Sequence, residues 1–376
     1  MRRIFMKFNC RKEDIQEALQ TVERAISRKH TPLPVLTGIH MEAKADGTVI
    51  VQASDYDLSI RTHFLAAVEQ PGVALLPGTF LTGLIRKVPA ETVSFAYQET
   101  DRKMKVDSGP ADFSLLTIPP EDFPILKNME TENQITIKDS IFRDLIKKTI
   151  FACSTDESRP VFTAGLLEIE GQILRMVATN THRLALKEIS LEQEWPNHVR
   201  LLIPSRVLQE IAKQIHGDVP QDVTFGWQRN LFFCSFGNTY LTCRLVEGQF
   251  PDYRKVIPEV GETSFEVKTS DMRSAVDRVS LVLREGEYNV VRMKIESSQI
   301  VITARNLDVG DSTEAVSAKV EGQEMDLGFN VRYLMDILKN MESESFTGST
   351  NGPLTPLLIK PVGEEGYLYI VTPVRK

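Results

Sequence analysis

Two short clusters of polar residues have the types and spacing that acid–base chemistry needs. Asp55 and Asp57 stand two residues apart in SDYDLSI, and on a strand two such carboxylates point to the same face. His182 stands beside Arg183 in ATNTHRLAL. A structural role competes with catalysis in both places, because Asp often hydrogen-bonds its own main chain in turns. A cytosolic hydrolase that uses the Asp55/Asp57 or His182 region therefore stays open as one interpretation.

Other kinds of chemistry leave no motif in the sequence. No glycine is followed by lysine and no G-x-G occurs, so the phosphate cradles of P-loop and dinucleotide-binding proteins are missing. The G-x-S-x-G pattern of serine hydrolases is missing too. The six histidines never stand at i, i+4 and the cysteines form no C-x-x-C pair, which disfavours a metal site or a disulfide framework. We expect no cofactor and no metal, and reduced, buried thiols at Cys10, Cys153, Cys234 and Cys243.

Composition describes a globular protein with more than one core. The chain has 376 residues, of which 42% are hydrophobic and 25% are charged; this length predicts two to four domains. No apolar run approaches the roughly 18 residues of a membrane helix, and MRRIFMKF lacks the apolar core of a signal peptide. We expect a cytoplasmic protein. Its net charge of -7 argues against a nucleic-acid partner unless the charge is unevenly distributed.

The elements that must position these residues recur with a period of about 126 residues. An apolar strand that ends in a short polar turn surrounds Asp55, Asn180 and Asn306, which are 125 and 126 residues apart. A helix follows each turn, and the three helices start at Pro77, Pro204 and Asn330, which are 127 and 126 residues apart. The chain is therefore predicted to contain three copies of one unit.

Each unit is predicted to be α+β, with two helices and several antiparallel strands. The opening helices are predicted within residues 11–26, 139–151 and 270–283, because apolar residues recur there at i, i+3 and i+4. Polar residues near the expected helix starts include Asp14, Asp139, Ser205 and Ser270. Between the helices, short alternating runs such as VSFAYQ and NLFFCSF predict strands. We place the domains at residues 1–130, 131–258 and 259–376.

Positive charge is concentrated in the predicted helical segments, and negative charge is concentrated in the rest of the chain. Six helical windows (residues 11–30, 80–89, 140–150, 205–216, 270–284 and 331–340) carry +8 in total, so the rest of the chain carries -15. Lys and Arg commonly solvate the outer face of a helix. Their recurrence on all six helices equally favours a surface that faces a polyanion, held through phosphates without base readout. Neither Trp195 nor Trp227 falls in a basic helix, which argues against stacking on single strands.

Six motifs resemble the bacterial DNA polymerase III beta subunit family, the replicative sliding clamps. They are LPVLTGI at residues 33–39, SDYD at 54–57, RPVF at 159–162, ATNTHRLA at 178–185, EGQFPDYR at 247–254 and PVR at 373–375. They follow one another over the whole chain from about Met6, at the separations of that family. The resemblance implies a DNA clamp fold that closes as a head-to-tail dimeric ring of six domains, with helices inside and strands outside.

The function implied by the resemblance is that of a processivity factor without a catalytic site. The ring would encircle duplex DNA, slide without base readout, and tether the replicative polymerase, the clamp loader and repair proteins. A ring linked topologically to DNA needs no strong local contact, so diffuse positive charge suits sliding. A duplex binder that does not encircle DNA is the remaining alternative, and its affinity for short linear DNA should fall steeply with salt.

The resemblance also implies a pocket between the second and third domains that receives a short linear peptide. Phe162, Thr181 and Thr372 depart from the residues that are commoner in the family, and Lys376 ends the chain, so peptide preference stays open. The implied pocket residues are Phe162, Thr179, Thr181, His182, Arg183, Leu184, Pro251, Lys255, Val256, Ile370, Val371, Thr372, Pro373, Val374 and Arg375.

Two further sets of residues follow from the same resemblance. The ring interface is expected to join the first domain to the third domain of the partner, near Phe113, Val282 and Leu283. The residues expected to face DNA are basic, lie on the helices or in one loop, and comprise Arg28, Lys29, His30, Arg86, Lys87, Arg143, Lys147, Lys148, Arg206, Lys213, Arg273, Arg278, Arg332 and Lys339.

Overall fold

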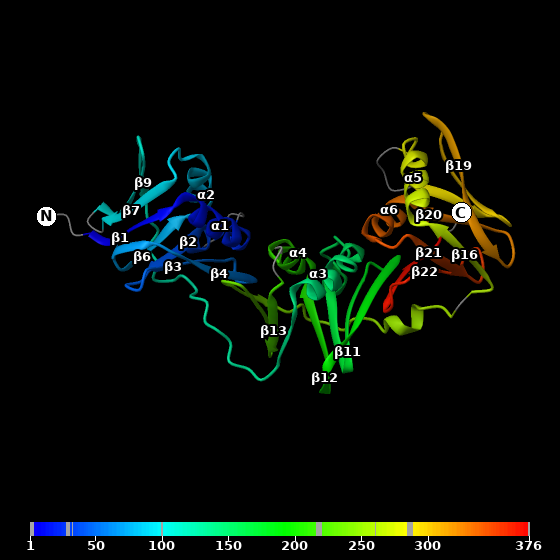
Figure 1. Ribbon diagram of the computed structural model, residues 1–376, viewed down its shortest axis with the longest axis horizontal. Coiled ribbons are helices and arrows are strands. Elements are labelled where there is room, and N and C mark those ends of the chain that lie inside the picture. The colour runs from blue at the N-terminus through cyan, green and yellow to red at the C-terminus, as the bar shows by residue number, and fades with distance from the viewer. Residues whose placement is uncertain are drawn as a thin grey trace. The chain divides into compact units, whose positions relative to one another are not determined.

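The computed structural model describes residues 4–27, 31, 33–98, 101–215, 220–259, 261–283 and 289–374 (Figure 1). The chain divides into two compact units. Unit 1 contains Met1–Phe142 and Lys213–Leu245, and unit 2 contains Arg143–Ala212 and Val246–Lys376. Both units include part of the predicted second domain, for a reason that the sheet pairing explains. None of the described helices is long and apolar enough to cross a membrane.

Unit 1 is built on two antiparallel sheets. The first has five strands in the order β5 (Ala67–Gln70), β1 (Ile4–Arg11), β7 (Thr92–Gln98), β8 (Lys103–Ser108) and β9 (Ala111–Leu116). The second has eight strands in the order β10 (Gln134–Lys138), β13 (Asp222–Gln228), β14 (Leu231–Phe236), β15 (Thr239–Arg244), β4 (Leu58–Leu65), β3 (Thr48–Ser54), β2 (Gly38–Ala43) and β6 (Gly72–Pro77). Since β15 pairs with β4, this sheet runs from the predicted second domain into the first.

Unit 2 contains one sheet of ten strands. Their order is β11 (Ala164–Thr179), β12 (Arg183–Pro204), β23 (Tyr367–Val371), β22 (Leu357–Pro361), β21 (Ser345–Thr350), β16 (Thr263–Lys268), β19 (Gly310–Glu321), β18 (Gln299–Asn306), β17 (Val290–Ile295) and β20 (Met325–Asn330). The pairing of β12 with β23 carries this sheet from the predicted second domain into the third. Main-chain pairing thus joins one part of the second domain to the first domain and the other part to the third. The boundary between the two compact units therefore falls within the second domain.

The described part of the chain contains six α-helices, at the places where the sequence predicts them. They are α1 (Lys12–Val22), α2 (Gly78–Lys87), α3 (Asp139–Lys147), α4 (Ser205–Gln214), α5 (Thr269–Ser280) and α6 (Val331–Asn340). α1 contacts α2, and α5 contacts α6. The predicted apolar faces are buried, as Ile15 and Leu19 of α1 and Leu334 and Leu338 of α6 show. The fold class is confirmed as α+β with two helices in each repeat and antiparallel pairing throughout the described strands.

Two of the predicted helix starts differ in detail. α1 begins at Lys12 and α5 at Thr269, so Asp14 and Ser270 lie inside the first turn and the N-cap residues are Arg11 and Lys268. Asp14 instead forms an ion pair with the Arg11 side chain. A carboxylate in the first turn still interacts favourably with the helix dipole. In α6 the Asn330 side chain caps the helix by accepting the main-chain N–H of Arg332.

The cysteines and one histidine are packed in these cores. All four cysteines are thiols; Cys10, Cys234 and Cys243 are buried and Cys153 is half-buried, and burial raises the pKa of the Cys10 thiol to about 12. His40 on β2 is 6% exposed and stacks on Phe123, with 5.2 Å between ring centroids. Its Nδ1 atom is buried without a hydrogen-bond partner. Desolvation lowers the pKa of His40 from 6.5 to about 4.

His40 should make the stability of the protein depend on pH. The unfolded chain binds a proton at this histidine below about pH 6.5, whereas the folded protein resists the proton down to about pH 4. Stability that is present above pH 6.5 is therefore lost as the pH falls towards 4, by up to about 3 kcal/mol. We expect His40→Gln to flatten this part of the pH profile in urea unfolding. The control His63→Gln removes an exposed histidine of β4; an equal change in both variants would contradict the assignment.

Candidate peptide-binding and DNA-facing surfaces

The polar residues that end the repeated strands close hairpin turns. In each turn the side-chain oxygen of Asp55, Asn180 or Asn306 accepts main-chain N–H groups two and three residues further on, over 2.8–3.2 Å. The next residue in the first two turns has a positive φ, 71° at Tyr56 and 77° at Thr181. Asp55 and Asn180 thus stabilise a strained main chain. This geometry supports the structural interpretation of these residues over acid–base catalysis.

His182 and Arg183 are not arranged as a catalytic pair. The exposed His182 ring stacks against Tyr333, with 6.4 Å between centroids. Arg183 is 8% exposed, and its guanidinium group donates to Asp336 of α6 and to the Phe151 carbonyl. The same group lies 4.6 Å from the centre of the Tyr333 ring. Arg183 is therefore a buried cation that attaches the start of β12 to α6.

The pairing of β12 with β23 separates the predicted pocket residues into two faces. Leu184 stands opposite Ile370, and Arg183 stands opposite Val371. Side chains alternate across a strand, so these two pairs point to opposite sides. Leu184 and Ile370 belong to one apolar cluster together with Phe250 and Tyr253. Val371 belongs to the other core, under α5 and α6. The side chains of Arg183 and Val371 therefore point away from the face that carries Leu184, and these two residues contribute mainly main-chain groups to it.

The remaining predicted pocket residues surround these strands within unit 2. Phe162 lies half-buried on the short helix η5 (Pro160–Thr163), below the Arg159 guanidinium group. The chain end is attached to the turn, because the main-chain N–H and Oγ1 of Thr372 both donate to the His182 carbonyl at 2.9 Å. Arg375 and Lys376 lie outside the described residues. Of the others, Thr179 is buried, Pro373 is half-buried, and Thr181, Pro251, Lys255, Val256 and Val374 are exposed.

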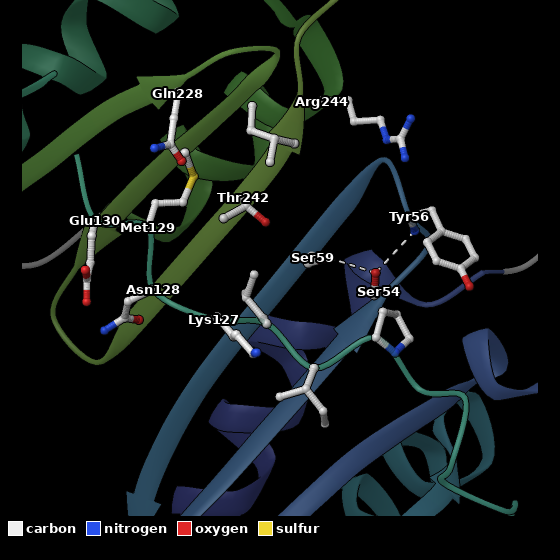
Figure 2. A pocket seen from close by; sticks show the side chains of 14 residues that line it. Ser54, Tyr56, Ser59, Lys127, Asn128, Met129, Glu130, Gln228, Thr242 and Arg244 are labelled. Carbon is white, nitrogen blue, oxygen red and sulfur yellow. Dashed lines mark hydrogen bonds between the residues drawn. The ribbon is translucent and has the colours of Figure 1, made fainter.

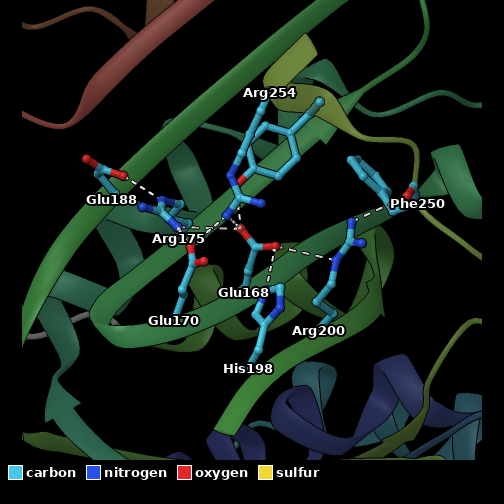
Figure 3. A network of polar contacts seen from close by, with 9 residues as sticks. Glu168, Glu170, Arg175, Glu188, His198, Arg200, Phe250 and Arg254 are labelled. Carbon is cyan, nitrogen blue, oxygen red and sulfur yellow. Dashed lines mark hydrogen bonds and ion pairs between the residues drawn. The ribbon is translucent and has the colours of Figure 1, made fainter. Parts of the chain in front are cut away.

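A buried carboxylate that the sequence analysis missed holds the segment before the third domain. Glu168 on β11 is fully buried and accepts the Tyr253 hydroxyl (Figure 3). Tyr253 begins η6 (Tyr253–Val256), which carries Lys255 and Val256. Burial and this hydrogen bond raise the pKa of the Tyr253 hydroxyl. No motif marks Glu168, because its partners come from three separate stretches of the chain.

Three arginines and a histidine surround this carboxylate. Arg254 Nη2 lies 3.0 Å from Glu168 Oε2, and Arg200 Nε lies 3.4 Å from Oε1. Arg175 lies 3.7 Å away, and His198 Nε2 lies 3.1 Å from Oε1. Figure 3 shows these side chains converging on Glu168 from β11, β12 and η6. A buried charge is stable only when it is paired in this way. The network fixes η6 against the long β11–β12 hairpin.

Removal of the Glu168 charge should destabilise unit 2. Glu168→Gln keeps the shape of the side chain but leaves the surrounding cations without their buried partner, at a cost of about 3 kcal/mol in the free energy of unfolding. Denaturant unfolding measures this loss. Glu170→Gln is the matched control, because Glu170 contacts Arg175 and Arg254 from a side chain that is 50% exposed. A Glu168→Gln protein as stable as the control would contradict the structural role of the network.

Most residues predicted to face DNA are accessible. Arg143 is half-buried, and Arg28, Lys29 and His30 lie outside the described residues. Among the exposed cations, Arg86 lies 2.7 Å from Glu23, and Arg278 binds Glu314 through two nitrogens. The exposed residues of the set are Arg86, Lys87, Lys147, Arg206, Lys213, Arg273, Arg278, Arg332 and Lys339.

Lys148 corrects the prediction for α3. Its side chain is 10% exposed, and Nζ forms ion pairs with Asp144 at 3.0 Å and with Glu364 at 2.6 Å. The ammonium group also lies 5.7 Å from the centre of the Tyr367 ring. A lysine that is neutralised twice and buried does not face DNA. Local sequence patterns do not reveal this burial, because Glu364 stands 216 residues away.

The residues predicted for the ring interface lie at accessible places in each unit. Phe113 is half-buried on β9, the edge strand of the five-stranded sheet. Val282 and Leu283 are half-buried after α5 and pack against the core of unit 2. The neighbouring Leu281 is 80% exposed. An edge strand offers unpaired main-chain groups, which suits pairing with another chain.

The three α+β repeats, joined by continuous sheets and with exposed cations on α2, α3, α4, α5 and α6, define a protein of the clamp class. The N-terminal, central and C-terminal domains of the DNA polymerase III beta subunit match residues 6–127, 136–252 and 254–375. The chain belongs to the DNA polymerase III beta subunit family. It is a DNA polymerase processivity factor and not an enzyme.

Similar proteins cover almost the whole chain. The beta sliding clamp of Bacillus subtilis (strain 168) is 32% identical over 381 residues, which are 98% of this chain and 100% of that protein. The crystal structure of the DNA polymerase sliding clamp from Bacillus subtilis superposes with a TM-score of 0.93 at 31% identity, and covers 99% of this chain and 100% of that one. A sliding clamp from Bartonella birtlesii bound to griselimycin gives a TM-score of 0.93 at 28% identity, with 99% and 100% covered.

Proposed function

We propose that two copies of this chain close head to tail into a ring around duplex DNA, and that the six helices of each copy face the DNA. The observation that carries the proposal is that exposed Lys and Arg side chains recur on α2, α3, α4, α5 and α6. The six sequence windows that hold +8 also include segments beside these helices. Exposed cations such as Lys147, Lys213 and Lys339 lie on three different helices. Diffuse charge of this kind attracts phosphates without reading bases.

The proposed ring joins the Phe113 edge of one copy to the segment around Val282 and Leu283 of the other. The position of β9 at the edge of its sheet and the exposed Leu281 support this assignment. We further propose the domain boundaries given above and a cytoplasmic location, where a replicated chromosome is accessible. Two units that are each held by continuous sheets suit a ring that must not open while it slides.

A ring that is topologically linked to DNA should stay on circular DNA and leave linear DNA, whereas a protein that binds only by surface contacts should not distinguish the two. We expect a particle of about twice the chain mass of 42.4 kDa, retained on nicked circular DNA at a salt concentration that weakens contacts with phosphates. Linearising the circle with a restriction enzyme should release it, which gel filtration of the mixture measures. Equal retention on circular and linear DNA would instead identify a duplex binder that does not encircle its partner.

We propose that partner proteins bind the face of unit 2 that carries Leu184 and Ile370. Its apolar cluster, the exposed Val256 of η6 and the attached chain end at Thr372 form the edges of this face. Apolar pockets with a few oriented main-chain groups are typical peptide sites. The replicative polymerase, the clamp loader and repair proteins are the expected owners of such peptides. Phe162 and Thr181 adapt the face to the partners of this particular chain.

Val256 provides a test of this surface. Its side chain is 51% exposed, so Val256→Asp should fold normally while placing a charge in an apolar contact. We expect the affinity for a peptide from the chain's own replicative polymerase to fall at least about tenfold, or about 1.4 kcal/mol, in fluorescence anisotropy. Retention on circular DNA should not change. Val309→Asp, at an exposed apolar residue of the third repeat, is the control, and equal losses in both variants would contradict the assignment.

A further inference from the structure

Unit 1 contains a cavity of about 620 Å³ beside the pairing of β4 with β15 (Figure 2). Its volume lies within the range of roughly 300–1,000 Å³ that is usual for ligand sites. In Figure 2, Tyr56 and Arg244 lie at one end, and Asn128 and Glu130 lie at the other. The residues that line it include Tyr56, Ser59, Pro124, Met129, Thr242 and Arg244.

This cavity lies beside the junction of β4 with β15, and the predicted peptide groove lies beside the corresponding junction of β12 with β23, one repeat later in the chain. Leu58 pairs with Cys243 on β4 and β15, as Arg183 pairs with Val371 on β12 and β23. The main-chain N–H of Arg244 donates to the Asp57 carbonyl at 3.0 Å, and this bond corresponds to the one between Thr372 and His182 at 2.9 Å. The two junctions therefore have the same strand pairing and the same main-chain hydrogen bond.

The lining confirms the correspondence residue by residue. Each of the six residues stands 125 to 128 positions before a residue predicted for the peptide groove. Leu58 and Cys243, the counterparts of Arg183 and Val371, are absent from the lining, as expected for side chains on the other face of the strands. The groove residues that correspond to the lining are, in order, Thr181, Leu184, Pro251, Val256, Ile370 and Thr372.

The chemistry of the two places differs. Ser59 and Thr242 stand where the later repeat has Leu184 and Ile370, so the floor of the cavity is more polar. Apolar side chains border it instead: Tyr56 is 47% exposed, Ile125 is 53% exposed and Leu231 is 37% exposed. A cluster of exposed apolar side chains on one concave surface is typical of an interaction site.

The charges on the lining favour an acidic occupant. Lys127 and Arg244 are exposed cations of the lining, and Glu130 is its one acidic residue. The Asp55 turn holds the main chain of Tyr56 at a positive φ, and the half-exposed Tyr56 side chain lines the cavity. Exposed aromatic side chains beside cations suit peptides that combine an apolar side chain with a carboxylate.

We propose that this cavity is a second peptide groove, which binds a short acidic and apolar linear segment of a partner protein. The proposal rests on the proposed function, because it extends the peptide groove of unit 2 to the preceding junction. One chain would then hold two different peptides at once, the more apolar one in unit 2 and the more acidic one in unit 1. A partner could thereby contact the clamp at two junctions of the same copy.

The test counts peptides per chain. A labelled octapeptide of aspartate, leucine and phenylalanine serves as the probe, and native mass spectrometry of the full-length protein gives the stoichiometry. We expect two peptides per chain in the wild type, and one in Arg244→Glu and in Val256→Asp. The double variant should bind none. Replacing the aspartates of the probe by lysines should weaken binding to Val256→Asp, which retains only the unit 1 groove, by about tenfold.

Each other outcome has a definite meaning. One peptide per wild-type chain, lost in Val256→Asp and kept in Arg244→Glu, overturns the second groove and leaves the proposed function intact. No peptide bound by the wild type overturns both peptide grooves, whereas retention on circular DNA tests the ring separately. Binding of a thymidine oligonucleotide that Arg244→Glu abolishes, with the peptide count unchanged, overturns the peptide assignment in favour of single-stranded nucleic acid. Lys127→Glu, at a second exposed lining cation, should reproduce the effect of Arg244→Glu if that variant proves unstable.

Discussion

Antiparallel main-chain pairing between strands of neighbouring repeats is the interaction on which the other features depend. β15 continues a sheet begun by β4, and β23 continues one begun by β12. Such pairing satisfies main-chain groups that would otherwise be exposed at a strand edge. It also brings the end of one repeat against the turn of the preceding one, as the bond from Thr372 to the His182 carbonyl shows. Both proposed peptide grooves on this chain are built beside these junctions.

Charged residues serve two opposite purposes in this protein. On the helices they are spread thinly and exposed, which suits a sliding contact with phosphates. Around Glu168 they are concentrated and buried, which suits a fixed attachment of η6 to the β11–β12 hairpin. Lys148 shows that the residue type alone does not distinguish the two, because its burial beside Asp144 and Glu364 makes it structural. Local dielectric and partner geometry decide the role of each cation.

Because the repeats share one backbone arrangement, the corresponding junctions can carry different side chains and bind different partners. The two junctions share their pairing, their turns and their main-chain bonds, yet Ser59 and Thr242 stand in one where Leu184 and Ile370 stand in the other. The scaffold is fixed by the main chain, so side chains on the accessible face can vary without loss of the fold. The opposite face cannot vary as freely, because Val371 is packed into a core.

The sequence by itself determined the three repeats, the six helices and the fold class, because these depend on local periodicity and on spacing along the chain. It also placed the turns at Asp55 and Asn180 and, through the family motifs, the kind of protein. Only the tertiary structure decided which face of β12 each side chain occupies, that Lys148 is buried, and that Glu168 is surrounded by cations. These facts depend on contacts between residues far apart in the sequence, such as Lys148 with Glu364, and local patterns carry no information about them.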